Sequence, residues 1–441
     1  MRSFLLIAIL LCFAILPFEL PIAEALHGIL WHSIGNIYLL FICGTWVSVI
    51  ASCFIVLNAH RMLQGWQQFV LYSALFIILG LLAVGSTAFT SPENLQLSFQ
   101  QLIFGYTAPV LLGFTLFCMN NEERKRAWLA FYAGACLFLM GSLVLLFVSW
   151  RAAVSQSSFF AGLGIGQKLF AWRYTFGEPW NLYSIYIGNA NKESNYLIMF
   201  LLFSTSLLGN RVHEKGRTRV VYIVFWALSI FTLLMLFSRA AILLLPVVIY
   251  VSGFWGTLRR AVKLTITAFI GFGAAISYAS YSAVFAYLFT ATYIDDVSAG
   301  VLGTFNDRFQ QWKELATYLM EHQGKLFFGF GTGGYGLHFF NSVERGTHNM
   351  FLDSLAECGI LGFAFLVVLV LWLLLDSLDF FLSRRVHAVA FIGIVALIAL
   401  MFREHSVSYL YVTSLGGLCF VALFYLLACP GRLYKSAMVE Q

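Results

Sequence analysis

The sequence has few charged residues and few prolines. Only 10% of its 441 residues are Asp, Glu, Lys or Arg, and only 7 are proline. A soluble domain carries roughly 25% charged residues, so this composition excludes an ordinary soluble protein. Apolar residues take their place, because 61% of the chain is hydrophobic and 45 residues are phenylalanine. We therefore expect an all-α polytopic membrane protein.

The chain also lacks the cysteine patterns of disulfide-rich and metal-binding proteins. Its 8 cysteines form no CxxC pair and no metal-type Cys/His spacing, and each lies in or beside an apolar run. Asp295 and Asp296 are paired but have no further carboxylate at ligand spacing. We expect no metal and no cofactor. The net charge of +6 mainly reflects connections on one side of a membrane, so we expect no nucleic-acid partner.

Long apolar runs recur along the whole chain. A helix of about 17–25 apolar residues crosses a hydrocarbon core, and the runs show no alternation of the kind found in membrane β-barrels. We expect about twelve transmembrane helices, with ranges 3–23, 34–57, 67–88, 101–118, 127–149, 194–209, 220–237, 240–256, 264–287, 350–375, 387–402 and 409–428.

Lys and Arg gather in alternate connections, which predicts that both termini are cytoplasmic. Two long polar segments then lie on the outer side, at 150–193 and 288–349, and we expect short helices in both because such long loops are usually functional. The resulting regions are 1–149, 150–193, 194–287, 288–349 and 350–441. The cytoplasmic basic residues are Arg2, Arg61, Arg124, Lys125, Arg126, Arg211, Lys215, Arg217, Arg219, Arg259, Arg260, Lys263, Arg384, Arg385, Arg432 and Lys435.

Two arginines on the outer side are candidate anion ligands. Arg239, in SRAAILLL, lies isolated at a tight turn between two apolar runs, where a guanidinium is costly unless it is paired. Its planar fork suits phosphate oxygens, although it can also extend to lipid head groups. Arg308 begins a helix predicted from Asn306, and the alternative for it is a solvated surface charge. The apolar face of that helix would hold Phe309, Trp312, Leu315 and Leu319.

The first outer segment offers Arg173 and a run of asparagines. Asn189, Asn191 and Asn195 lie at the start of an apolar run, where the amides of a helix N-terminus can face an anion. A capped surface loop explains the same residues. In the second segment, GFGTGGYG lacks the GK[ST] of a nucleotide loop, so we expect a flexible turn there.

His348 and Asn349 directly precede the apolar run at 350–375. An imidazole with a pKa near 6.5 can accept a hydroxyl proton at neutral pH, although a lone boundary histidine is often structural. On a continuous helix Asp353 would lie roughly 140° around from His348, so it can orient the ring only if the helix begins after His348. Otherwise Asp353 and Glu357 should meet polar groups of neighbouring helices.

Four motifs in this order resemble the O-antigen ligase/polymerase superfamily: SRAAILLL, RFQQW, LFFGFGTGGYG and THNMFLDSLAECGILG. The likeness lies mainly in residues 189–365. It implies a GT-C-like membrane fold and a periplasmic site that takes a saccharide from an undecaprenyl-diphosphate carrier. It places Arg239 and Arg308 on the diphosphate and makes His348 the base. Further candidate substrate-binding residues are Arg173, Asn189, Asn191 and Asn349, although Ala190 replaces the proline of the superfamily's Asn-Pro-Asn.

We therefore expect a metal-independent, inverting glycosyltransferase in the bacterial inner membrane, in contact with membrane lipids. The resemblance allows two acceptors, lipid A–core for an O-antigen ligase and another carrier-linked glycan for a polymerase, and we favour the ligase. A lipid-linked glycan flippase is less favoured, because the charges gather at the outer rim rather than along a path through the membrane.

Overall fold

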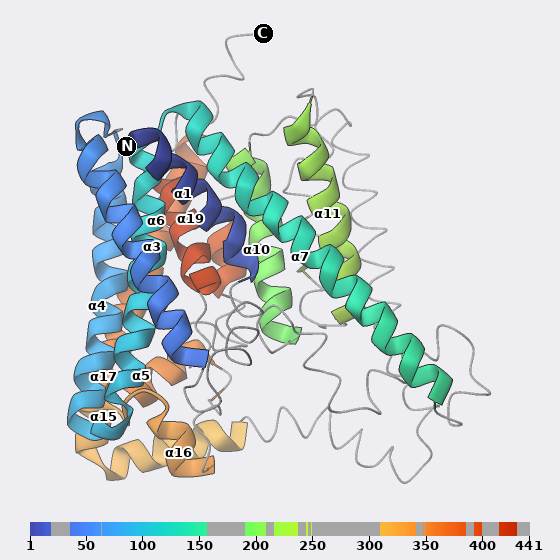
Figure 1. Ribbon diagram of the computed structural model, residues 1–441. Coiled ribbons are helices and arrows are strands. Elements are labelled where there is room, and N and C mark those ends of the chain that lie inside the picture. Colours follow the sequence, from blue (N-terminus) through green and yellow to red (C-terminus); the bar gives the residue numbers. More distant parts are fainter. Residues whose placement is uncertain are drawn as a thin grey trace.

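The computed structural model describes residues 1–18, 36–62, 64–156, 190–208, 216–236, 244–245, 248, 309–340, 347, 349–384, 392–398 and 414–429. All regular structure in these residues is helical (Figure 1). Five helical segments are long and apolar enough to cross a membrane, namely Cys43–Arg61, Trp66–Thr90, Pro92–Cys118, Asn121–Val144 and Met350–Asp379. The expected all-α polytopic membrane protein is confirmed, while the number twelve and the GT-C-like arrangement stay predictions.

The helices follow the apolar runs of the sequence closely. For example, the helix expected at 67–88 is α4, which covers Trp66–Thr90. The helix expected at 127–149 is longer than predicted at both ends, because α7 begins before 127 and continues past 149. The expected runs at 240–256 and 264–287 lie outside the described residues, apart from 244–245 and 248. The main helices are α1 Arg2–Ile15, α3 Asn36–Asn58, α4, α7 Asn121–Gln156, α10 Ala190–Leu208, α11 Arg217–Leu236, α17 Met350–Arg384 and α19 Ser414–Ala428.

The expected span 101–118 is a broken helix. It consists of α5 Leu95–Gln101, a π-helical turn Leu102–Thr107, α6 Ala108–Thr115 and a 3-10 turn Leu116–Cys118. A π-helical turn accommodates an extra residue in a helix. Gly105 lies in this turn, and its carbonyl oxygen contacts α19. A Cβ at Gly417 would lie 2.2 Å from that oxygen, so the close crossing requires glycine.

A polar contact joins three helices at one end of the bundle, which we call the Arg2 end. Arg2 Nη2 forms a salt bridge of 2.8 Å with Glu123 at the start of α7, and Arg2 Nε donates to Asn58 Oδ1 at the end of α3 over 2.8 Å. The end of α19 lies at this end too, because a Cβ at Gly65, just before α4, would lie 2.0 Å from Ala428 O. The first and the last described helix therefore share one end.

Helices α4 and α17 run antiparallel along each other. Asp376 of α17 accepts hydrogen bonds from Gln68 Nε2, over 3.2 Å, and from the Tyr72 hydroxyl of α4. At the opposite ends of the pair, Ser86 Oγ donates to Glu357 O over 2.6 Å. The start of α17 thus lies at the end of the bundle away from Arg2, where Figure 1 also shows α15 and α16.

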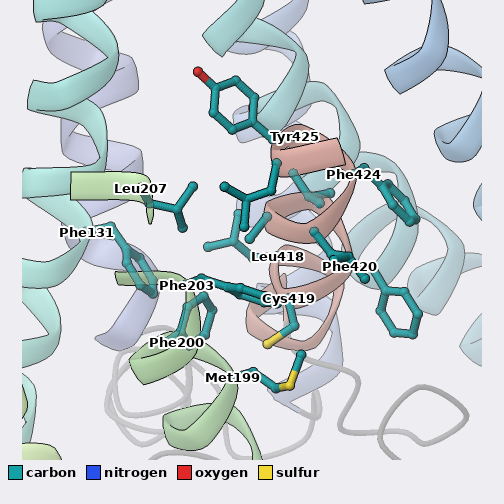
Figure 2. Packing of buried hydrophobic residues seen from close by; sticks show 14 of the residues in the cluster. Phe131, Met199, Phe200, Phe203, Leu207, Leu418, Cys419, Phe420, Phe424 and Tyr425 are labelled. Atoms are coloured by element: carbon teal, nitrogen blue, oxygen red, sulfur yellow. The ribbon is translucent and has the colours of Figure 1, made fainter. Parts of the chain in front are cut away.

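Helix α19 lies in the middle of the apolar core. It is buried on every side from Leu418 to Ala428, as expected for a helix that is apolar all round. Figure 2 shows Phe131 of α7 and Phe200 and Phe203 of α10 facing it. Aromatic pairs continue through the core, with ring centroids 4.8 Å apart for Phe131 and Phe200 and 4.9 Å apart for Phe76 and Phe420. Each such pair adds about 0.5–1.5 kcal/mol to the burial itself.

The crossing of α1 and α7 gives a test of this packing. A Cβ at Gly134 of α7 would lie 2.0 Å from Ala14 O, whereas nothing lies within 4 Å of a Cβ at Gly141 on the same helix. We expect Gly134→Ala to lower the free energy of unfolding by about 1–3 kcal/mol through overpacking. Gly141→Ala is the matched control, which should leave stability unchanged or slightly raised because alanine favours helix. Thermal unfolding in detergent measures both, and equal shifts would contradict the crossing.

Candidate functional site

The predicted site residues are only partly within the described residues. Asn349 is described with its side chain, and Asn191 lies in α10 with only its backbone described. The two neighbours of His348 in sequence, Thr347 and Asn349, are both buried. These two residues and the side chains that bond to them are called the frame around His348. Outside the described residues lie Arg173, Asn189, Arg239, Arg308 and His348.

Helix α17 begins at Met350, after His348 in the sequence. This is the condition under which Asp353 was expected to be able to orient the ring of His348. Asp353 Oδ1 accepts a hydrogen bond of 2.7 Å from the backbone N–H of Thr347, and Asp353 is 2% exposed. The carboxylate therefore fixes the backbone that directly precedes His348.

Asn349 caps α17. Its side-chain Oδ1 accepts hydrogen bonds from the N–H groups of Phe351, over 3.0 Å, and Leu352, over 3.3 Å. Both donors belong to the first turn of a helix, where backbone N–H groups have no partner within the helix. Asn349 was predicted to bind substrate, and the structure gives its oxygen a local role in starting the helix.

Thr347 closes the same turn, and the sequence analysis did not select it. Thr347 Oγ1 donates to Asn349 O over 2.9 Å and accepts from Asn349 N over 3.2 Å. A sequence signal for this turn was present, because the hydroxyl of threonine and the amide of asparagine often bond to nearby backbone in turns. The residues on both sides of His348 are therefore bonded to each other.

Trp312 connects this turn to the second outer segment. Its Nε1 donates to Thr347 O over 2.7 Å, and it lies in the helix at 309–321, four residues after Arg308 in sequence. Of the apolar face predicted for this helix, Leu315 and Leu319 are buried, each 1% exposed, and Trp312 is half-buried. Phe309, the first residue of the same pattern, is exposed.

The glycine turn at 329–333 is fixed rather than flexible. Gly329, Gly331 and Gly333 have φ of 73°, 78° and 69°, a region that side chains other than glycine rarely adopt. The N–H groups of Phe330 and Gly331 donate to Ala356 O, over 2.7 Å, and Glu357 O, over 3.0 Å.

Glu357 holds the end of the same turn. Its carboxylate Oε1 accepts from Gly333 N over 3.3 Å, and its side chain is 5% exposed. Since the amides of Phe330, Gly331 and Gly333 already bond to protein, they are not available to hold a phosphate, which agrees with the rejection of a nucleotide loop. The sequence analysis expected Glu357 to meet polar groups of a neighbouring helix, whereas its side chain bonds to a backbone amide of the glycine turn.

Hydroxyl groups at the end of α4 hold the glycine turn from its other side. Ser86 Oγ donates to Phe328 O and Ser91 Oγ donates to Phe330 O over 2.6 Å. Thr332 N donates to Thr87 Oγ1 over 2.8 Å. The sequence analysis missed these residues, although the cluster of Ser and Thr in STAFTS at the end of an apolar run was a visible signal.

The electrostatic environment of the outer segment is acidic around Tyr335 of α16 (Gly334–Phe340). Burial raises the pKa of the Tyr335 phenol, and the nearby charges of Asp353 and Glu314 raise it further. Tyr335 therefore stays protonated at neutral pH. Among the described residues no group of three or more His, Cys, Asp or Glu side chains could hold a metal ion, and metal independence stays a prediction.

Residues 223–367 match a family model described as O-antigen ligase. The matched range includes Arg239, Arg308 and His348 together with Trp312, Asp353 and Glu357, whereas Arg173, Asn189 and Asn191 precede it. The resemblance to the O-antigen ligase/polymerase superfamily is thereby confirmed for this third of the chain. A comparison with curated proteins finds no match.

The cap at Asn349 can be tested separately from any activity. We expect Asn349→Ala to lower the free energy of unfolding by about 1 kcal/mol, because two N–H groups in the first turn of α17 lose their acceptor. Asn349→Asp keeps an acceptor oxygen in place and should lose much less. Thermal unfolding of the two variants in detergent makes the comparison, and equal losses would show that the cap contributes nothing.

Proposed function

We propose, from the O-antigen ligase match over residues 223–367, that this protein is a membrane glycosyltransferase. It moves a saccharide from an undecaprenyl-diphosphate carrier to an acceptor hydroxyl of lipid A–core, as an O-antigen ligase. The observation that carries the proposal is that the three candidate catalytic residues all lie within the matched range. Arg239 and Arg308 hold the diphosphate, and His348 takes the proton of the acceptor hydroxyl.

The frame around His348 supports its assignment as the base. Trp312 and Asp353 bond to the backbone of Thr347 directly before it, and the Thr347 hydroxyl bonds to the backbone of Asn349 directly after it. A general base acts best when its position is fixed before the substrate arrives. A mobile loop would have to be ordered at each turnover. The buried, hydrogen-bonded flanks of His348 remove that cost.

The proposed chemistry is a single displacement. The acceptor oxygen forms a bond to the anomeric carbon while the bond from that carbon to the carrier diphosphate breaks, and His348 receives the hydroxyl proton. Negative charge grows on the diphosphate as it leaves, and guanidinium groups aimed at it stabilise the transition state. One displacement inverts the configuration at the anomeric carbon.

The membrane arrangement supports this chemistry at the periplasmic face. Basic residues at the Arg2 end assign that end to the cytoplasm by the positive-inside rule, and the start of α17 with the glycine turn lies at the opposite end of α4. A lipid-linked donor can then keep its polyprenyl chain among the helices while its diphosphate reaches the outer rim. Arg173, Asn189 and Asn191 are proposed as further contacts to the donor.

A transfer assay tests the function. Purified protein in liposomes, supplied with an undecaprenyl-diphosphate glycan and lipid A–core in the presence of EDTA, should attach the glycan to lipid A–core at the rate seen without EDTA. Gels and mass spectrometry resolve the products. If the products are longer carrier-linked glycans, the protein is a polymerase and not a ligase. Absence of both products would overturn the proposal. A rate lost with EDTA and restored by Mg²⁺ would contradict metal independence.

The three catalytic assignments are tested by substitution. We expect His348→Ala, Arg239→Ala and Arg308→Ala each to lower kcat by about 10²–10³-fold, the effect of removing one transition-state contact. Matched controls are His322→Ala, an exposed histidine of the outer segment, and Arg61→Ala, an exposed arginine at the Arg2 end, which should keep full activity. If correctly folded His348→Ala transfers at the normal rate, His348 is not the base.

A further inference from the structure

Three large aromatic side chains are exposed where α15 (Gln323–Phe328) meets the end of α4. Phe89 is 81% exposed, Phe327 54% and Phe328 49%. The rings of Phe89 and Phe328 are 5.9 Å apart between centroids, so they form one surface, which we call the aromatic patch. Contiguous exposed apolar surface of this kind marks an interaction site.

The backbone beneath the patch is locked in place. Ser86 Oγ donates to Phe328 O, and Gly359 of α17, with φ of 66°, lies so close that a Cβ on it would be 2.1 Å from Phe327 O. With the backbone fixed on α4 and α17, Phe327 and Phe328 cannot turn inward. The exposure of their side chains is therefore built into the fold.

The aromatic patch continues the lipid-facing surface of α17. Directly after Gly359, Ile360 and Leu361 are exposed, and further along the same candidate span so are Val368, Leu371 and Leu375. Apolar side chains on the outside of a transmembrane helix face lipid. Figure 1 shows α15 beside the ends of α4 and α17, and the backbones of α15 and α17 meet where Gly359 lies against Phe327 O.

The other side of α15 packs against the protein. Leu326 packs inward on the small core of Leu315, Leu319, Phe330, Tyr335 and Ala356. Lys325 is half-buried, with its Nζ 5.2 Å from the centroid of the Phe330 ring. Desolvation lowers the pKa of Lys325, while the charge of Glu93 opposes that change. Lys325 also precedes the exposed Phe327 by two residues on the same short helix, and a lysine close in sequence to exposed aromatic residues is typical of the level of lipid head groups.

We propose that α15 is an interfacial helix, whose aromatic patch of Phe89, Phe327 and Phe328 inserts into the outer boundary between acyl chains and lipid head groups. The occupant of the patch is the lipid bilayer itself. Continuity with α17 favours lipid over a protein partner. This goes beyond the proposed function, since it holds for any activity of the chain. It sets the adjoining glycine turn and Thr347 at the depth of the head groups.

Photo-cross-linking tests the contact directly. The photoreactive p-benzoylphenylalanine replaces Phe327 or Phe328 with little change of shape, and each variant is illuminated in liposomes of phosphatidylethanolamine and phosphatidylglycerol. Leu371 replaced in the same way is the positive control, because it lies exposed in the middle of a span. Gln310, exposed and bonded to Glu314 in the outer segment, is the negative control. Gel filtration before illumination selects correctly folded protein.

We expect phospholipid adducts at positions 327 and 328, found by mass spectrometry, in at least half the yield seen at 371, and no adduct at 310. If 371 gives the adduct but 327 and 328 do not, the patch faces water and the proposal is wrong. Cross-links from 327 or 328 to a second copy of the chain would also overturn it, because they would assign the patch to a protein interface.

Discussion

The backbone crossing between the glycine turn and α17 determines the structure of the end of the bundle away from Arg2. Gly329 lies against the carbonyl of Glu357, where a Cβ would be 2.4 Å from the oxygen, and a Cβ at Gly359 would be 2.1 Å from Phe327 O. Only residues without a side chain permit this approach, and both glycines also have positive φ. The segment 309–340 and the start of α17 are thereby joined into one unit, and the frame around His348 belongs to it.

The same crossing explains why so many hydroxyl groups gather at the end of α4. At the rim of a membrane, a backbone carbonyl without a partner is costly. The carbonyls of Ala356 and Glu357, next to the kink of α17, accept from Phe330 N, Gly331 N and Ser86 Oγ. The carbonyl of Phe330 accepts from Ser91 Oγ. These carbonyl groups of α17 and of the glycine turn therefore have hydrogen-bond donors, and α4 and the serine that follows it supply two of the donors.

Hydropathy predicted the positions of α3, α4, α10 and α11 because the bilayer requires a continuous apolar run. Spacing also predicted the burial of Leu315 and Leu319. Neither signal reveals how helices cross. The polar residue types at Thr347 and Ser86 are visible in the sequence, but the partners of these side chains depend on that crossing. Phe309 belongs to the same apolar pattern and is exposed, because apolar spacing identifies a face but not whether another element covers its first turn.

The contact of Arg2 with Glu123 has a consequence for the assembly of the chain in the membrane. The two residues are 121 positions apart, and α1 also crosses α7 where Gly134 meets Ala14. Helix α1 therefore has a packing partner that is made much later in synthesis. Insertion and packing of α1 are separate stages, because its contacts with α7 can form only after α7 has been synthesised.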